Sequence, residues 1–349
     1  TSYTLKGVDA VIEGGPLVPL SLLNGLRRAL VSTLDALATD PPKRMIAEGS
    51  VLTALRPGMD ADPGGDALPA LSALCRTTLQ VAAAVSAGVR TIYLDHQDPK
   101  EFAEAVAVAR SGPGETAVFV ATPRIEKPGE TNLFRALAKH GADGLLVRNA
   151  GGLAFCAEHD IPFVADFSLN AANELTVAYL KARDALRVTA SYDLSFDQLD
   201  DLLKAAPPHW LEVVIHQQIP MFHMEHCVFC AFLSPGTDAT NCGRPCDHHE
   251  VKLRDRVGME HPLKADVGCR NTLYNAVPQT AAEYLPRLIS RGVRHLRVEF
   301  LDDEPATVTR ILGLYQDAMA GRREAKDLWR DLKATNQYGV TRGQLAVLQ

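Results

Sequence analysis

The sequence predicts an α/β protein, a (β/α)8 barrel with a cysteine-rich insertion between its seventh and eighth strands and a small N-terminal appendage. Three observations predict it. From residue 70 onward, short apolar runs alternate with helix-like stretches. There are eight such runs, and several follow a glycine at the end of a helix-like stretch, as in HGADGLLVR. A doubly wound open sheet is the main alternative.

The eight predicted strands are 71–75, 90–95, 117–121, 144–148, 162–166, 186–190, 211–216 and 295–300. Helical stretches such as PKEFAEAVAVAR and DQLDDLLKAA lie between or after them. Because one strand leads to a helix and then to the next strand, neighbouring strands are expected to run parallel.

Four segments are expected along the chain. Residues 1–55 form the appendage, the end of a preceding domain, with a helix capped by Ser21. Residues 56–69, rich in Pro, Gly and Asp, form a linker. Residues 70–322 form the barrel and contain the insertion at 217–294, and 323–349 form a C-terminal tail. Since the insertion follows the carboxyl end of a strand, we expect it on the catalytic face.

Composition is that of a globular protein. Hydrophobic residues make up 46% and charged residues 22% of the 349. The net charge of −6 gives no overall basic field that would attract nucleic acid, but it does not exclude a local basic patch. No apolar run is long enough to span a membrane and no signal peptide is present, so we expect a cytoplasmic protein.

Five of the seven cysteines lie between positions 227 and 269, in a C-x2-C pair, a C-x3-C pair and a lone fifth. They are Cys227, Cys230, Cys242, Cys246 and Cys269. Thiolates this close can converge on one metal, and four suffice, so one is spare. Spacing alone leaves a zinc ion and a 4Fe–4S cluster equally open. Cys75 and Cys156 stand apart in apolar stretches, as core residues do.

Several stretches resemble the collagenase-like peptidase family U32. DFSLNAANELTVAYL (166–180) is similar to the family's D-x-S-L-N-x-x-N stretch, and LEVVIH (211–216) to its L-E-x-x-V-H strand. NCGRPCD (241–247) is similar to its second cysteine pair. Residues 3–38 resemble the domain that follows the barrel in long, RNA-hydroxylase-type members. The chain therefore resembles the C-terminal half of such a member, with an N-terminal half or partner subunit elsewhere.

The resemblance implies a 4Fe–4S cluster and oxygen-independent hydroxylation of an RNA base (tRNA or rRNA) or a small aromatic substrate, with a prephenate-like co-substrate. It implies Cys227, Cys242, Cys246 and Cys269 as ligands and Cys230 as the spare. Two departures leave the substrate and the catalytic status of this half open. Residues 217–220 replace the family's G-A-x-C, and the K-I-E-G-R strand keeps only its glutamate, as Glu299.

Polar residues at the carboxyl ends of predicted strands are candidate catalytic groups. Asp166 and Asn170 follow the fifth strand, His216 ends the seventh and Glu299 lies in the eighth. Helix capping or a hydrogen-bonded core position would explain them equally well. Four further residues also end predicted strands and are weaker candidates for a catalytic role: Asp95, His96, Arg148 and Asn149.

Basic residues crowd the cysteine segment. Arg244, Arg254 and Arg270 are expected to bind the phosphates of RNA or the carboxylates of a prephenate-like acid. A solvated loop paired with nearby acids such as Asp247 and Asp255 is the alternative.

Three functions compete: an iron–sulfur hydroxylase, a non-catalytic RNA-binding half held together by its metal, and a peptidase. The peptidase has the least support, because neither H-E-x-x-H nor G-x-S-x-G occurs and cysteines bound to a cluster cannot act as nucleophiles.

Overall fold

The computed structural model describes residues 3–9, 11, 13–40, 45, 48–59, 69–238, 240–332, 334–336, 339–340 and 345. The chain divides into two compact units, Thr1–Ala54 and Leu55–Gln349. The second unit carries the barrel and the cysteine-rich insertion.

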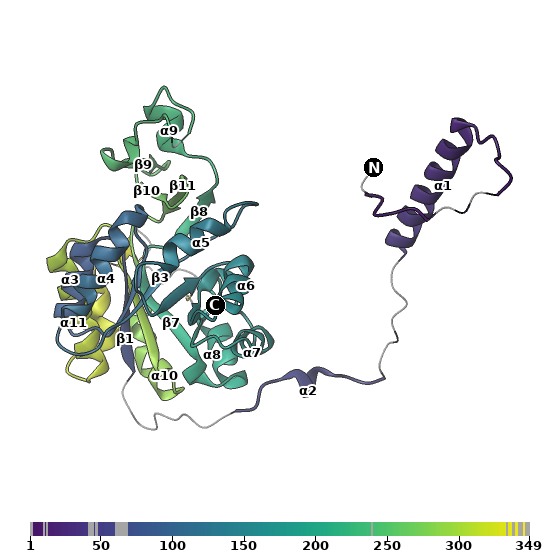
Figure 1. Cartoon of the computed structure of the whole chain (residues 1–349). Helices are drawn as coiled ribbons and strands as arrows, with labels where there is room; N and C mark the ends of the chain where they lie inside the picture. The colour runs from purple at the N-terminus through teal and green to yellow at the C-terminus, as the bar shows by residue number, and fades with distance from the viewer. Residues whose placement is uncertain are drawn as a thin grey trace. The chain divides into compact units, whose positions relative to one another are not determined.

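Parallel strands of the second unit close into a barrel (Figure 1). In the described residues they are β1 (Ala70–Cys75), β2 (Thr91–Leu94), β3 (Ala117–Ala121), β4 (Gly144–Val147), β5 (Phe163–Ala165), β6 (Val188–Thr189), β7 (Leu211–Gln217) and β13 (His295–Glu299). β13 pairs with β1 and with β7, and β7 also pairs with β6, so the sheet has no free edge there. Each strand overlaps one of the eight predicted runs, and the predicted barrel is confirmed.

Helices follow the strands and cover the outside of the barrel. They are α3 (Thr78–Ser86), α4 (Phe102–Arg110), α5 (Thr131–Ala138), α6 (Ala150–Glu158), α7 (Glu174–Lys181), α8 (Phe196–Ala205), α10 (Leu285–Ser290) and α11 (Pro305–Met319). Short side chains begin several of them. Asn149, Asn173 and Ser195 accept hydrogen bonds from the backbone N–H groups of the first turns of α6, α7 and α8.

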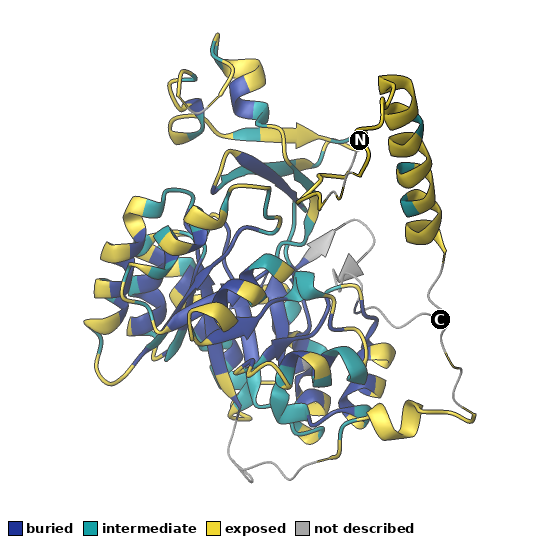
Figure 2. Ribbon diagram, turned by 45° about the vertical axis from the view of Figure 1, so that its right-hand side comes forward, coloured by how far each residue is buried: buried dark blue, intermediate teal, exposed yellow. Residues whose placement is uncertain are grey.

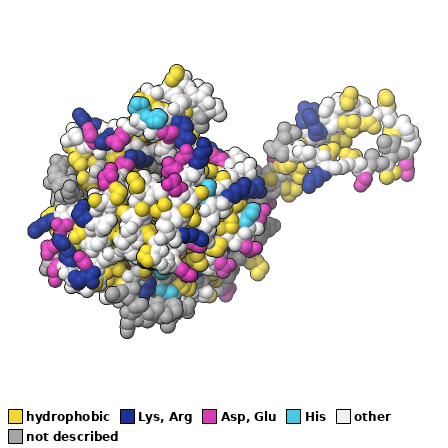
Figure 3. Space-filling model, turned by 60° about the vertical axis from the view of Figure 1, so that its left-hand side comes forward, with side chains coloured by type: hydrophobic (Ala, Val, Ile, Leu, Met, Phe, Trp, Pro, Cys, Tyr) yellow, Lys and Arg dark blue, Asp and Glu magenta, His cyan; other side chains and the backbone are white. Residues whose placement is uncertain are grey.

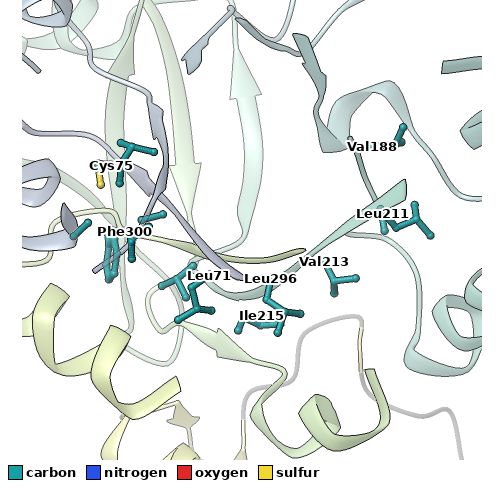
Figure 4. Packing of buried hydrophobic residues seen from close by; sticks show 14 of the residues in the cluster. Leu71, Cys75, Val188, Leu211, Val213, Ile215, Leu296 and Phe300 are labelled. Atoms are coloured by element: carbon teal, nitrogen blue, oxygen red, sulfur yellow. The ribbon is translucent and has the colours of Figure 1, made fainter. Parts of the chain in front are cut away.

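The period-two alternation of the strands separates two apolar layers. In β1, Leu71, Ala73 and Cys75 face the helices, whereas Leu74 points into the barrel. Figure 4 shows the outer layer, where Leu71 lies close to Leu296 of β13. The inner layer is small and contains Leu74, Tyr93, Phe119, Ala121, Leu146 and Val164. The rest of the barrel interior is available for polar side chains.

The insertion between β7 and β13 forms an antiparallel sheet at the carboxyl ends of the barrel strands (Figure 1). Its order is β8 (Pro220–Met224), β11 (Arg270–Tyr274), β10 (Glu260–Asp266) and β9 (Val251–Arg254). α9 (Val228–Leu233) and the short helix η4 (Pro245–Asp247) lie in the long loop after β8. Phe229, Leu263 and Leu273 form a separate small core there. β12 (Gln279–Thr280) then returns the chain to the barrel by pairing with β7.

The chain ends differ from the barrel. In the N-terminal unit, α1 (Leu20–Thr39) has no buried residue (Figure 2), and α2 (Leu52–Leu55) follows it near the boundary of the two units. Ser21, expected to cap the first helix, lies inside it, because α1 begins at Leu20. Most of the predicted linker, residues 60–68, falls outside the described residues.

The last described segment contains the short helices η6 (Ala325–Asp327) and α12 (Leu328–Asp331) and the strands β14 (Thr335–Asn336) and β15 (Gly339–Val340). Leu328 and Leu332 are buried in the outer core of the barrel. None of the helices in the described ranges combines the length and apolar character of a membrane span.

Candidate metal centre and barrel mouth

All five clustered cysteines line one cavity of about 590 Å³ in the insertion. Cys227 and Cys230 come from the start of α9, and Cys242 and Cys246 from the loop around η4. Cys269 comes from the turn between β10 and β11. The fold therefore brings together the three sequence segments that spacing alone had grouped.

The backbone around the thiols is shaped by residues with positive φ. Gly243 and Arg244 both have positive φ, so the chain turns sharply between Cys242 and Cys246, and the Arg244 N–H donates to Cys242 Sγ at 3.4 Å. Gly268 also has positive φ, and a Cβ there would meet the Arg270 guanidinium at 2.2 Å. Glycine is thus required on the approach to Cys269.

The donor set suits a soft metal centre. Thiolates bind iron–sulfur clusters and zinc, and N–H···S hydrogen bonds like the one to Cys242 stabilise them. Burial, followed by neighbouring thiols, raises the pKa of Cys230 and Cys269, so binding a metal would release protons. Across the described ranges, no three His, Cys, Asp or Glu side chains form a group that could hold a metal ion. The thiols therefore suit a zinc ion or an iron–sulfur cluster chemically, and they share one cavity. Their sulfur atoms would have to move closer together to bind either group.

Beneath this cavity the barrel interior holds a buried ionic network centred on Arg297 of β13. Its guanidinium donates to Asp166 Oδ1 at 2.7 Å, to Glu212 Oε2 at 2.8 Å and to Glu299 Oε1 at 3.3 Å. It also lies over the ring of Tyr93, 4.3 Å from the centroid. Burial opposes ionisation of Glu212, but Arg297 overcomes it and lowers the pKa of this carboxyl to about 2. The charges are therefore paired although water is excluded.

A second set of pairs lies nearer the mouth. Arg148 holds Asp95 through two nitrogens, at 2.8 and 3.1 Å, and donates to Asp166 Oδ2 at 2.8 Å. Arg76 approaches the same Asp95 at 3.1 Å. Asp95, with two arginines, has its pKa lowered to about 2 although burial acts in the opposite direction.

A small cavity of about 30 Å³ remains at the barrel mouth. It is lined by Arg76, Asp95, Arg124, Arg148, Phe167, Tyr192, Pro220, His223, Asp266, Thr272, Tyr274 and Glu299. Asp266, at the end of β10, lines this cavity and the cysteine cavity. Burial and the nearby Asp95 raise the pKa of Asp266 to about 6. This carboxyl is the point at which the two cavities meet.

The predicted catalytic residues do not all meet. Asp166 and Glu299 do, since both contact Arg297. Asn170 ends the short helix η2 (Phe167–Leu169) in a left-handed conformation and is exposed. His216 points away from the mouth, because the β7–β13 register shifts beside it and its ring packs edge-on against Tyr315 of α11.

The predicted basic residues are all engaged with acids. Arg244 pairs with Asp98 at 2.9 Å and with Asp247 at 2.8 Å. Exposed Arg254 pairs with Glu260 at 2.6 Å. Arg270 is buried and pairs with Glu225 at 3.0 Å and with Glu130. Only Arg244 of the three lines the cysteine cavity.

Sequence reasoning missed several residues of the barrel interior and of the mouth. Arg297 and Glu212 lie inside strands, where a charge between apolar neighbours signals an inward-facing partner. Arg76 and Arg124 follow the carboxyl ends of β1 and β3, the position that had already singled out Asp166.

Several solved structures are similar to this chain at a low level. A putative fructose-1,6-biphosphate aldolase from Coccidioides immitis has 9% identity and a TM-score of 0.40, covering 74% of this chain and 93% of its own. Tryptophan synthase from M. tuberculosis has 13% identity and a TM-score of 0.39, covering 79% and 100%. Thiamine phosphate pyrophosphorylase from Pyrococcus furiosus has 10% identity and a TM-score of 0.38, covering 72% and 96%. Similarity at this level supports no inference about substrate.

No curated protein matches the sequence. The family model described as Peptidase family U32 matches residues 80–344, which include almost the whole barrel and the entire insertion. The chain therefore belongs to peptidase family U32.

Proposed function

We propose that the chain holds a 4Fe–4S cluster on Cys227, Cys242, Cys246 and Cys269 and takes part in oxygen-independent hydroxylation of an RNA base or a small aromatic substrate. One observation carries the proposal. Cysteines from three separate segments line a single cavity at the carboxyl ends of the barrel strands, where barrel enzymes have their active sites.

The cavity of about 590 Å³ has room for a 4Fe–4S cluster. A zinc ion would require the sulfur atoms to close to about 2.3 Å from a single centre. Cys230 fits the role of the spare cysteine. It is buried, and its thiol donates to the Gly236 carbonyl at 3.4 Å, a bond that a metal-bound thiolate could not donate.

A bound cluster would supply one-electron chemistry. The chain's own residues would hold and transfer protons and would position the substrate beside the cluster. Asp266 borders both cavities, and its raised pKa allows it to hold a proton near neutral pH. The pairs of Arg148 and Arg76 with Asp95 fix the wall behind Asp266.

One observation supports the alternative of a non-catalytic, metal-stabilised RNA-binding half. The mouth cavity of about 30 Å³ cannot admit a nucleobase. The charge pattern favours neither form of RNA binding, because positive and negative side chains are interspersed on the face in Figure 3 and RNA would meet no single basic patch there. Peptidase activity has less support, since burial raises the thiol pKa of Cys75 and Cys156 and both lie in the core.

Metal analysis after anaerobic purification tests the proposal. We expect iron and sulfide in about a four-to-four ratio per chain with a cluster absorption band, lost in Cys242→Ala. Cys156→Ala, a core cysteine outside the cavity, is the matched control and should retain the iron. One zinc without sulfide would rule out the hydroxylase and leave the cysteines as a structural zinc site.

A further inference from the structure

The insertion forms part of the wall of the barrel mouth. Besides barrel residues, the mouth cavity of about 30 Å³ is lined by Pro220, His223, Asp266, Thr272 and Tyr274 of the insertion. Tyr274 is 8% exposed, its hydroxyl accepts from Arg76 at 3.3 Å, and the Arg76 guanidinium lies 5.2 Å from its ring centroid. One water needs about 10–15 Å³ of such space. With the insertion in this position, the mouth is therefore closed to any organic substrate.

No apolar core joins the insertion to the barrel in the described part of the chain. The small core of Phe229, Leu263 and Leu273 contains no barrel residue, and neither apolar cluster of the barrel includes a described side chain between positions 220 and 274. Two packed units move relative to one another unless a large apolar interface holds them together. The insertion therefore has the kind of interface that permits motion as a unit, with its own core intact.

Ion pairs cross this boundary, each with an insertion residue on one side and a barrel residue on the other. We call four of them the latch pairs: Arg244–Asp98, Lys264–Asp302, Arg270–Glu130 and Glu225–Lys127. In each latch pair at least one side chain is more than a quarter exposed. Exposed pairs contribute little individually and are weakened by salt. The insertion is thus held on the barrel by contacts that can be broken and formed again.

Two short connections lead from the barrel into the insertion and back. Residues 218–219 join β7 to β8, and residues 275–278 join β11 to β12. Asn275 ties the two connections together, because its N–H donates to the Ile219 carbonyl at 2.9 Å and its carbonyl accepts from Gln218 Nε2 at 3.0 Å. Since both connections lie side by side, backbone rotations within them would swing the whole sheet, as in hinged domains.

We propose that the insertion is a lid, which swings about these two connections and is closed by the latch pairs. The structure shows the closed state. Opening would expose the polar side chains at the carboxyl ends of the barrel strands and admit a substrate to them. The assignment rests on the proposed function only for the substrate that enters, because the motion itself requires no cluster. As the latch is ionic, the balance between the open and closed states should depend on ionic strength.

Hydroxyl-radical footprinting of the full chain, read by mass spectrometry, tests the lid. Tyr274 reports opening, Phe229, 2% exposed, reports unfolding of the insertion, and Phe232, 80% exposed, calibrates the radical dose. We expect the oxidation of Tyr274 relative to Phe232 to rise at least about threefold between about 0.05 M and about 1 M NaCl, because salt screens the latch pairs. Phe229 should stay protected, since the lid opens without unfolding.

A double variant, Asp98→Asn with Asp302→Asn, removes two latch pairs from the barrel side and leaves the sequence of the insertion unchanged. Asparagine at position 98 can still accept the hydrogen bond that Asp98 Oδ1 accepts from the Lys100 N–H at 3.0 Å. We expect Tyr274 oxidation to be raised about threefold already at low salt, with a smaller further rise on adding salt. The matched control, Asp201→Asn with Asp317→Asn, also removes two exposed ion pairs, both outside the insertion, and should behave as wild type.

Tyr274 oxidation that is constant across salt and unchanged in the double variant would overturn the lid. So would a parallel rise at Phe229, because the insertion would then unfold rather than swing. If the double variant does not fold, the salt titration of the wild-type chain decides by itself. Iron analysis of the same samples separates the two proposals. Salt-dependent exposure of Tyr274 in iron-free protein upholds the lid while the cluster proposal fails, and constant protection in iron-loaded protein does the reverse.

Discussion

At the scale of single residues, the barrel interior depends on one arginine. Arg297 is fully buried and bonds the carboxylates of Asp166, Glu212 and Glu299. Asp166 directly follows β5, and the two glutamates lie in β7 and β13. Removing the cation would leave buried carboxylates without their charged partner, away from bulk solvent. Three strands would thereby lose their common polar contact.

We expect Arg297→Met to reduce the free energy of unfolding by about 3–5 kcal/mol, the usual cost of removing one partner of a buried pair. Urea denaturation followed by circular dichroism measures it. The control is Arg322→Gln, which removes an exposed ion pair with Asp317. It should change the free energy of unfolding by less than about 1 kcal/mol. A loss below about 1 kcal/mol for Arg297→Met would show that the network can rearrange at little cost.

At the scale of elements, the insertion is a small sheet with a core of its own. Phe229 of α9 packs with Leu263 of β10 and Leu273 of β11, apart from the main core. Asn271, fully buried in β11, accepts from the Val228 N–H at 2.6 Å and so holds the start of α9 against the sheet. A core this small leaves the insertion less stable than the barrel, so it should open locally.

Phe229→Ala should therefore loosen the insertion and spare the barrel. A buried Phe→Ala change typically costs about 3–5 kcal/mol, which a core of this size cannot absorb. Hydrogen exchange with mass spectrometry should show faster exchange across β8–β11 and unchanged exchange in β1–β6. Phe232→Ala on the same helix removes an 80% exposed ring and is the matched control. Equal exchange in the two variants would argue against a separate core.

At the scale of the whole molecule, buried carboxylates make stability depend on pH. Glu212 and Asp95 have folded-state pKa values near 2, below the ordinary values of about 4. Above pH 5 both are ionised in the folded and unfolded chain, and their pairing contributes fully. As the pH falls towards 2, the unfolded chain takes up protons first, so this stability is lost.

We expect the urea midpoint of the chain to fall steadily between pH 5 and pH 3. Glu212→Gln should lower the midpoint at pH 7 and reduce its slope with pH, because one carboxylate with a depressed pKa is gone. Exposed Glu158→Gln on α6 should keep the wild-type slope. An unchanged slope in Glu212→Gln would mean that other groups dominate the acid transition.

The sequence by itself determined the barrel and the segment that contains the candidate metal ligands. Apolar runs at strand spacing located all eight strands, because burial between two layers demands apolar residues at those positions. The cysteine spacing located the candidate ligands for a related reason, since thiols that share a metal must lie on short connecting loops.

Only the tertiary structure decided which charged side chains form ion pairs. Arg244, Arg254 and Arg270 lie near one another in sequence, yet each is paired with acids, whereas no acid among the described residues forms an ion pair with Arg124. His216 and Glu299 both lie near the carboxyl ends of their strands, but a register shift turns His216 outward and leaves Glu299 at the mouth. Periodicity indicates the direction of a side chain along one strand. It cannot give the partner on another strand, because pairing depends on distances set by the closure of the barrel.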